Sequence, residues 1–365
     1  MKRLMLVCLL ILCLLPLGVC AESTAVEWFT GTGEIYNSLG EHFFYEIEDD
    51  HAVLTDYSVD SDKPQPARVV VPDTLAGMPL TAVGWGAFNN YDGSYNGEDV
   101  ECIILPEGIT ELRTNAFQCA HYIDRLELPS TLEKISTDYP FYHLSAEISF
   151  SNGNPFYTID NGFLIDTRTN ALIYCNPSTQ TLPLPRVRRI EDSALSNYRY
   201  QQEILEFPDS VEYIGPFNAY DCVNLKKIIV PGSVIELADH ALYCSYADEI
   251  ILNEGLQKIG SEALTETCVH KLTIPSTVTW IGYYAFDLGY DEYWQDPEES
   301  EGKDDDYSHS EEDDENYDES EEDSEDCDDS DEDDDSDDSE EYSLIVLNPD
   351  VHWETEKEYA KRKGY

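Results

Sequence analysis

The chain is poor in positive charge. Its 365 residues contain 21 lysines and arginines against 76 aspartates and glutamates, which gives a formal net charge of −55 at pH 7. A field of this sign repels phosphate backbones and anionic lipid headgroups. We therefore expect neither a nucleic acid nor an anionic membrane surface as a partner.

The sequence also lacks the short motifs that carry catalysis. Gly-x-Ser-x-Gly, His-Glu-x-x-His and Gly-x-x-x-x-Gly-Lys-Ser/Thr are absent, and the histidines share no spacing that would place a nucleophile beside a base. Paired carboxylates are so frequent that they say nothing of glycosidase chemistry. No Cys-x-x-Cys pair completes a zinc site. These absences favour a protein that is not an enzyme and has no catalytic residues, metal site or cofactor.

One long apolar run is present, and it is too short to cross a membrane. It covers residues 4–17 behind two basic residues, whereas a spanning helix needs roughly 20. The small residues before Glu22 suit cleavage, so residues 1–21 are predicted to be a signal peptide. Lipidation at Cys20 is the alternative, although Val19 is larger than the residue that normally precedes a lipidated cysteine. We expect a secreted or surface-associated chain without a membrane span.

Acidic residues are concentrated in one segment that has no aliphatic side chains. Between Asp296 and Glu341, 30 of 46 residues are acidic and one is basic. Such a segment cannot collapse, so residues 287–341 are predicted to be a disordered insert. A long loop is tolerable because closure costs only about 0.6 kcal/mol more per doubling of length. We expect a solvated tether; the alternative is weak, many-site binding of calcium or of a basic partner.

The remainder of the chain is repetitive. An alternating apolar run ends at a proline at Pro106 and Pro129, 23 residues apart, and again at Pro208 and Pro231 with the same spacing. Apolar residues follow three and six positions later, and an Ala-aromatic or Ala-Leu pair closes most units. Units of about 22 residues cannot bury an apolar face alone, but stacked neighbours share one core. The pattern predicts a β-rich solenoid of about eight units.

The strand of each unit is expected to alternate between core and solvent. In residues 227–231, Ile228 and Val230 point inward and Ile229 points outward, and the proline ends the strand. A stripe of outward Ile and Val with a few charges indicates a contact face, unless these side chains pack under neighbouring loops. The candidate strand-face residues are Ile104, Glu127, Glu206, Lys227, Ile229, Glu249, Ile251, Lys271 and Thr273, and Val346 continues the outward row, with Cys102 at its upstream edge.

The turns of the repeat are rich in tyrosine, which offers a large contact area at a low cost in rotamer entropy. The candidate turn aromatics are Tyr198, Tyr200, Tyr220, Tyr243, Tyr246, Tyr283 and Tyr284. Cys119, Cys222 and Cys244 also fall in or near these turns, and we expect them to be small buried thiols. A disulfide between Cys222 and Cys244 of neighbouring units is the alternative.

One unit departs from the repeat. Between residues 151 and 186 two apolar runs flank Asn161-Gly162, a dipeptide that favours a hairpin because both turn positions need positive φ. We therefore expect a small hairpin elaboration built into the solenoid.

The consensus apolar-x-apolar-Pro-x-x-Val-x-x-Ile-Gly-x-x-Ala-Phe-x-x-Cys-x-x-Leu resembles the BspA-type leucine-rich repeat of bacterial surface proteins. It is clearest in residues 204–225 and 272–286; residues 44–47 resemble that family's usual first unit, and residues 357–365 its usual last segment. The resemblance implies a right-handed superhelix and non-enzymatic, adhesin-like binding of an extracellular protein or glycan by a monomer. The alternative is a cation-binding or structural surface protein whose repeats display the acidic insert.

These patterns divide the chain into a signal peptide (1–21), an N-terminal capping segment (22–68), the repeat solenoid (69–286, with the hairpin at 151–186), the acidic insert (287–341), and a terminal strand with a C-terminal cap (342–365).

Overall fold

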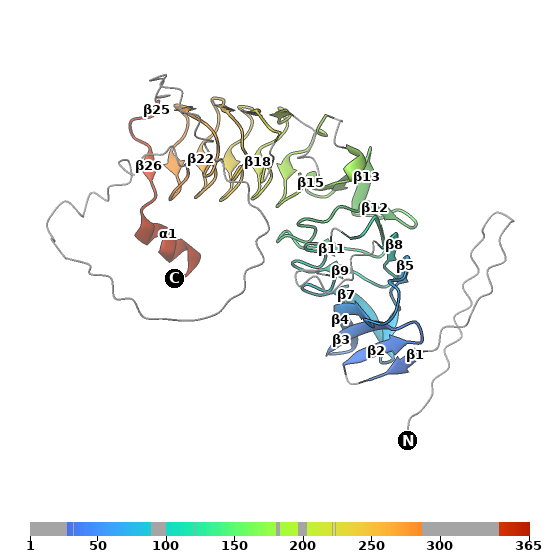
Figure 1. The fold of residues 1–365 in the computed structure, drawn as a ribbon. Helices are drawn as coiled ribbons and strands as arrows, with labels where there is room; N and C mark the ends of the chain where they lie inside the picture. The colour runs from blue at the N-terminus through green and yellow to red at the C-terminus, as the bar shows by residue number, and fades with distance from the viewer. Residues whose placement is uncertain are drawn as a thin grey trace, which may run out of the picture. The chain divides into compact units, whose positions relative to one another are not determined.

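The computed structural model describes residues 28–31, 33–88, 100–120, 122–179, 183–195, 203–220, 222, 224–286 and 343–365. The predicted signal peptide, the acidic insert, Tyr198 and Tyr200 lie outside these ranges. The described chain is β-rich, and its units follow one another side by side (Figure 1).

The chain begins with antiparallel pairing and then changes to parallel pairing at one strand. The opening strands are β1 (Trp28–Thr30), β2 (Glu34–Asn37), β3 (Glu41–Glu48) and β4 (His51–Val59). Each pairs with the next in antiparallel orientation, and the other edge of β4 pairs in parallel with β7 (Met78–Val83). The short β6 (Thr74–Leu75) folds back on β7. The edge of the first repeat is thus covered by the opening strands.

A first series of units builds two parallel ladders. The longer strands are β5 (Arg68–Val70), β8 (Cys102–Ile104), β10 (Arg125–Leu128) and β12 (Glu147–Phe150), in the order β12-β10-β8-β5. The shorter strands β9 (Glu111–Leu112) and β11 (Lys134–Ile135) continue the ladder that contains β4 and β7.

A second series repeats this arrangement. Its longer strands are β17 (Ile204–Glu206), β19 (Lys227–Val230), β21 (Glu249–Leu252), and the pair β23 (Lys271–Ile274) and β25 (Ser343–Val346). The other ladder begins with β15 (Ala171–Cys175) and continues with the two-residue short strands β16 (Arg189–Ile190), β18 (Tyr213–Ile214), β20 (Glu236–Leu237), β22 (Lys258–Ile259), β24 (Trp280–Ile281) and β26 (His352–Trp353). Helix α1 (Glu356–Lys363) ends the chain.

The core between the two ladders follows the repeat of the sequence. Ile228 and Val230 are fully buried, whereas Ile229 between them is half-buried, which confirms the predicted alternation. The apolar residues three and six positions after the proline are also fully buried, as Val234 and Leu237 show. Each unit therefore contributes side chains of both strands to a core that it shares with its neighbours, and the two series of units form two such cores.

Glycine follows the short strand in several units because the neighbouring backbone is too close for a side chain. The amide of Gly260 donates to the carbonyl oxygen of Leu237 at 2.9 Å, so its backbone lies directly on the preceding unit. A Cβ on Gly260 would lie 2.6 Å from the carbonyl oxygen of Ala238, and one on Gly215 would lie 3.0 Å from that of Ile190. This contact explains the Ile-Gly pair of the consensus.

A three-stranded meander separates the two series of units. It consists of β13 (Tyr157–Asp160), β14 (Phe163–Asp166) and β15, and a 3-10 turn, η1 (Pro177–Thr179), follows it. The turn from β13 to β14 has the positive φ angles predicted by its sequence, 49° at Asn161 and 88° at Gly162. Every residue of β14 is buried. Leu164 packs into the core of the first series, while Phe163 packs into that of the second.

Polar side chains of the meander complete the hydrogen bonding of the first series. The Asn176 side-chain amide accepts from the Ile148 backbone amide at 2.9 Å and donates to the Ile148 carbonyl at 3.0 Å. The Tyr174 hydroxyl donates to the carbonyl of Ala146 at 2.8 Å. Asn176 thus takes the place of a further strand at the open edge of β12.

Two details of the predicted outward row are wrong. In the terminal strand Thr273 lies opposite Ile345, which is 40% exposed, while Val346 lies opposite the inward Ile274 and packs against the core. The terminal strand ends in Asn-Pro instead of Pro, so the last alternating residue is displaced by one position. Cys102 is 8% exposed and therefore buried, although it occupies the same row as the exposed Arg125.

We expect Gly260→Ala to lower the free energy of unfolding by about 1–3 kcal/mol, because the added methyl group must push two units apart. Urea denaturation followed by circular dichroism measures this. Ser145→Ala, at an exposed position, serves as the control and should change stability by less than about 0.5 kcal/mol. Equal stability of Gly260→Ala and the control would contradict the close-contact explanation.

Candidate binding surfaces

The predicted strand-face residues line up in the register of the longer ladder. Ile229 lies opposite both Glu206 and Ile251, and in the first series Ile104 lies opposite Glu127 and Val70. Lys271 and Thr273 lie on β23, which pairs with β25. The row is interrupted after β12, where the meander intervenes, so the structure presents two rows in place of one.

The aliphatic residues of this face are neither fully exposed as a contact face nor fully packed under neighbouring loops. Ile104, Ile229 and Ile251 are half-buried. At the margins Ile204 is 53% exposed and Val70 is 41% exposed. The flat aliphatic row is therefore accessible at its edges and partly covered by its own neighbours along its middle.

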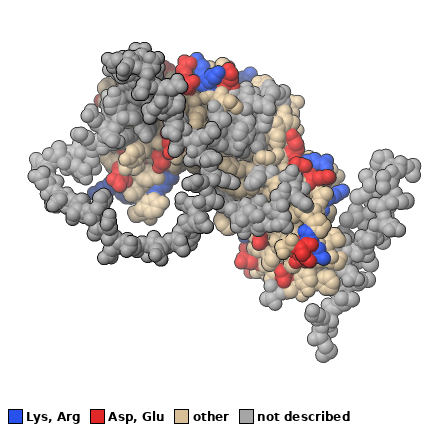
Figure 2. All heavy atoms as spheres, viewed as in Figure 1, with Lys and Arg blue, Asp and Glu red and all other residues tan. Residues whose placement is uncertain are grey.

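One pair of opposite charges on this face is matched across neighbouring strands. Lys227 on β19 forms an ion pair of 2.7 Å with Glu249 on β21. Other ion pairs of the described surface join neighbouring elements in the same way: Arg113–Glu48, Lys134–Glu111, Arg188–Glu212 and Lys258–Glu236. Figure 2 shows basic and acidic side chains lying beside one another on the visible face. The described repeats are not a uniformly acidic surface.

The turns after the short strands hold a cluster of aromatic side chains. Tyr220 and Tyr243 stack with their rings 6.0 Å apart, and Phe217 stacks on His240 at 5.1 Å. The turn aromatic cluster consists of Tyr139, Tyr142, His143, Phe217, Tyr220, His240 and Tyr243. Tyr139 and Phe217, 5.8 Å apart, belong to different series of units, so the cluster bridges the two series.

The sequence predicted only part of this cluster. Tyr220 and Tyr243 belong to it, whereas Tyr246 is half-buried elsewhere and Tyr283 contacts Tyr284 near the C-terminal end. Tyr139, Phe217 and His240 were missed, although all three have positive φ, between 51° and 58°. They share one repeat position, directly before the small residue that closes the unit. Alignment of the units on that position would have shown the aromatic row.

In one unit the Ala-aromatic pair, Ala219-Tyr220, comes one residue later than in the others. Asn218, and not Ala219, takes the place of the small buried residue, because it follows Ile214 by four residues, as Ala241 follows the paired Leu237. Its amide donates to the carbonyl oxygen of Ala241. The Asn218 side chain donates to the carbonyls of Glu191 and Gly215 and accepts from the amide of Leu195. This side chain fixes the ends of two short strands and one turn, and the Ala-Tyr pair is displaced by one residue.

A partly buried carboxylate lies beside the cluster. Burial, and then the charges of Glu191 and Asp138, raise the pKa of Asp192 to about 7, although Arg189 opposes them. Burial and the proximity of Asp192 raise the pKa of Tyr139 and that of Tyr213 to about 12. The surroundings of Asp192 therefore disfavour its ionised form.

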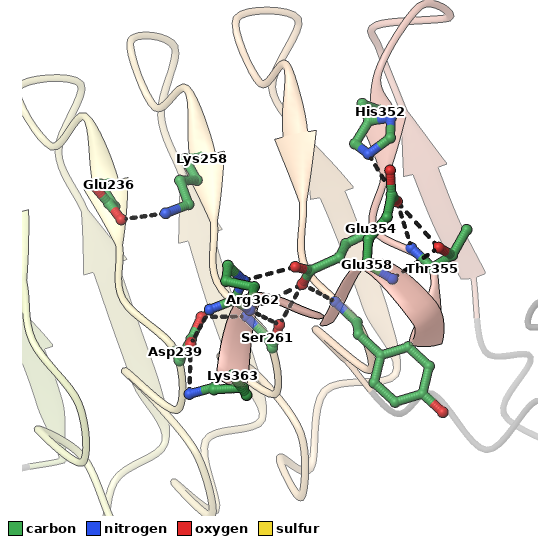
Figure 3. Close-up of polar contacts among 11 residues, drawn as sticks. Glu236, Asp239, Lys258, Ser261, His352, Glu354, Thr355, Glu358, Arg362 and Lys363 are labelled. Carbon is green, nitrogen blue, oxygen red and sulfur yellow. Dashed lines mark hydrogen bonds and ion pairs between the residues drawn. The ribbon is translucent and has the colours of Figure 1, made fainter. Parts of the chain in front are cut away.

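Helix α1 lies against the turns that follow the short strands β20 and β22 (Figure 3). The Arg362 guanidinium donates to Glu354 at 2.7 Å, to Asp239 at 2.7 Å and to the Ser261 hydroxyl at 2.8 Å. Lys363 adds an ion pair of 3.0 Å to Asp239. Burial alone would raise the pKa of Asp239, but these two cations outweigh it and lower the pKa to about 2.

The remaining predictions concern metals, thiols and membranes. Within the described ranges, no three His, Cys, Asp or Glu side chains are grouped as metal ligands. Six cysteines, Cys222 and Cys244 among them, are present as thiols; Cys222 is buried, but Cys119 and Cys244 are only half-buried. No helix in the described part of the chain has the length and apolarity needed to cross a membrane.

We expect Arg362→Met to lower stability at pH 7 by about 1–2 kcal/mol, because Asp239 and Glu354 lose their cation while the apolar stem remains. The folded pKa of Asp239 lies below its ordinary value of 3.8. Its ion pair therefore stabilises the fold above that pH and is lost as the pH falls towards 2. Thermal unfolding between pH 2 and 7 tests this; the exposed Lys361→Met is the control and should show no such pH-dependent loss.

Asp192→Asn should change stability in the opposite direction to Arg362→Met. The folded pKa of Asp192 lies above 3.8, so ionisation of Asp192 costs stability as the pH rises through 7. We expect Asp192→Asn to be more stable than the natural chain by about 1–2 kcal/mol at pH 8, and equal to it near pH 4. Urea unfolding at both pH values measures the difference. A variant that is less stable at pH 8 would contradict this environment for Asp192.

Comparison with known proteins places the repeat in a family. The model of the BspA-type leucine-rich repeat region matches residues 81–183 and 166–289, with six copies. No curated protein sequence matches this chain.

Several solved structures resemble the fold. The pneumococcal vaccine antigen PcpA is 13% identical, with a TM-score of 0.36 over 70% of this chain and 79% of that one. A leucine-rich repeat protein of Bacteroides ovatus is 15% identical, with a TM-score of 0.38 over 66% and 61%. The T. pallidum leucine-rich repeat protein is 18% identical, with a TM-score of 0.31 over 68% and 94%. Because the family match covers more than half of the 365 residues, this chain belongs to the BspA-type leucine-rich repeat family.

Proposed function

We propose that this chain is an exported, non-enzymatic binding protein, adhesin-like in its action, that recognises an extracellular protein or glycan by many weak contacts. The observation that carries the proposal is the registered strand face, in which Glu206, Ile229 and Ile251 follow one another at strand spacing. A solenoid offers such a row as a long, preformed surface, so little ordering entropy is lost on binding.

The composition of the strand face favours a protein partner over a strongly charged one. Lys227 and Glu249 neutralise each other, and aliphatic side chains lie on either side of them. Removal of exposed aliphatic area from water on contact supplies affinity, while the paired charges set the register. The turn aromatic cluster offers a second contact area, of the kind that also stacks on sugar rings.

The acidic insert is proposed to act as a tether that keeps the chain soluble and limits non-specific contacts. Its composition, 30 acidic residues of 46, also supports the alternative, in which the repeats display a cation-binding segment. A deletion of residues 296–341 distinguishes the two functions. A chain that binds through its strand face would keep its partner, whereas a chain that acts through the insert would lose its binding activity.

Export rests on the sequence of residues 1–21, which we propose to be a cleaved signal, with lipidation at Cys20 as the alternative. Mass spectrometry of the mature protein distinguishes a free amino terminus at Glu22 from a lipidated Cys20. We further propose that the exported chain acts as a monomer.

A capture experiment tests the strand face. The chain from Glu22 is immobilised and exposed to extracellular-matrix and cell-surface extracts, in parallel with a form that lacks residues 296–341. We expect a saturable partner that the deleted form retains and that Ile229→Lys/Ile251→Lys loses by tenfold or more, because two charges would be buried without partners.

Ile235→Lys is the matched control, because Ile235 is 44% exposed and lies in the loop after β19, outside the strand face. Equal loss in the control would indicate a general charge effect. Capture that requires the insert and disappears in moderate salt or with added calcium would contradict the strand-face proposal and support cation binding.

A further inference from the structure

The last long strands of the two series, β12 and β25, occupy equivalent positions. Each ends its ladder and pairs in parallel with the preceding long strand. The backbone amides of Glu147 in β12 and Ser343 in β25 both donate to the residue just before that preceding strand, at 2.8 Å. An Asn-Pro pair follows each strand, and the side chains of Asn154 and Asn348 donate to carbonyl oxygens of the preceding unit at 2.8 and 2.6 Å. What completes the edge of β12 therefore shows what the edge of β25 can bind.

Side chains of the meander occupy the outer edge of β12. The backbone N–H of Ile148 donates to the Asn176 side chain at 2.9 Å, and the Ile148 carbonyl accepts from the same side chain at 3.0 Å. The Ser178 amide donates to the Glu147 carboxylate at 2.7 Å. An open strand edge is a template for pairing with another chain. The first series closes this edge with its own side chains.

At β25 the equivalent backbone groups are unpaired. The amides of Ser343 and Leu347 donate towards β23 at 2.8 and 3.1 Å. Because alternate residues of a strand bond to opposite edges, the N–H and C=O groups of Leu344 and Val346 point away from β23, and Leu344 is the equivalent of Ile148. Among the residues that the structure describes, no strand pairs with this outer edge and no other group bonds to it. The second series therefore ends in an open edge.

The side chains of this edge favour the addition of a strand. Residues 343–347 contain no charge and no proline, although both commonly protect an edge strand from pairing. Ile345 is 40% exposed and Leu347 is 48% exposed. By contrast β5, at the far end of the longer ladder of the first series, carries the exposed Arg68 and lies between Pro66 and Pro72. The edge of β25 is thus the less protected of the two.

We propose that the outer edge of β25 binds an extended segment of a protein partner, which adds a strand to the longer ladder. The backbone of this segment bonds to the outer N–H and C=O groups of Leu344 and Val346, and its apolar side chains lie on Ile345 and Leu347. The inference rests on the proposed binding function and adds a second site to it. This site lies at the C-terminal end of the ladder, apart from the strand face on β19 and β21.

The charge next to this edge selects the partner. Glu341 is two residues from Ser343, and 30 of the 46 residues from Asp296 to Glu341 are acidic. Two copies that paired edge to edge would bring two of these segments together, and like charges within about 8 Å of one another are little screened at physiological salt. A basic segment is attracted instead. The partner strand therefore carries lysine or arginine beside its apolar residues, and a second copy of this chain is disfavoured.

Fluorescence anisotropy with a labelled peptide that copies residues 225–231 tests the edge. This peptide carries Lys226 and Lys227 before an apolar strand sequence, and it is titrated with the full mature chain at about 150 mM salt. The matched probe is the same peptide with every backbone N–H methylated, which keeps the charge and the side chains but cannot pair with a strand. We expect saturable binding of the first peptide, about tenfold or more stronger than binding of the methylated one, because the backbone hydrogen bonds are lost.

Val346→Pro tests the same edge from the side of the protein. It removes an outer N–H and leaves the bonds to β23 in place, since proline is tolerated in an edge strand when its nitrogen faces outward. We expect it to bind the peptide about tenfold more weakly than the natural chain. The matched control is Val70→Pro, the same substitution in the edge strand β5, and it should bind within about twofold of the natural chain. Circular dichroism checks that both variants are folded, and the methylated peptide tests the edge independently of them.

Equal binding of the two peptides, or unchanged binding by Val346→Pro, would overturn the proposal. So would a dimer of the natural chain that Val346→Pro abolishes, since a second copy would then occupy the edge. Peptide binding that appears only after deletion of residues 296–341 would assign the edge to the chain's own insert and would also overturn it. Any of these results with strand-face capture intact would remove the strand-addition site alone and leave the proposed function standing.

Discussion

The structure depends on the direct contact between the backbones of successive units. The short strands are only two residues long, so no unit forms enough hydrogen bonds or buries enough apolar area alone. Each unit must therefore lie on its neighbour at full contact distance, and the position after the short strand carries this requirement. Glycine there, as at Gly215 and Gly260, allows the approach. The binding surfaces inherit their regular spacing from this contact.

The meander shows how such a stack tolerates an interruption. β14 is buried on both sides, with Leu164 in one core and Phe163 in the other. Asn176 satisfies the edge of β12 with its side chain, because no strand follows there. On the turn side the space between the two series is spanned by Tyr139 and Phe217. The turn aromatic cluster is therefore a consequence of the interruption as well as a candidate contact area.

Much of the fold could be predicted because it follows from local patterns. The alternation at Ile228, Ile229 and Val230 and the turn at Asn161-Gly162 are set by chemistry within a few residues. The register of the terminal strand could not be predicted. β25 is positioned by its pairing with β23 across the insert, and counting residues back from the end of the strand does not reproduce that pairing. Asp192 was missed because its raised pKa depends on burial and, besides the neighbouring Glu191, on the charge of Asp138, which is distant in sequence.

The position of the insert separates the last unit from the other repeats along the chain. Residues 343–365 pair with β23 and β24 by parallel ladders and are fastened to Asp239 and Ser261 through Arg362. These contacts are all non-covalent, and the only peptide connection to the repeats runs through residues 287–342. A protease that cuts within this acidic stretch would turn one chain into two associated fragments. The shorter fragment would then be a detachable end piece, whose release would expose the edges of β23 and β24.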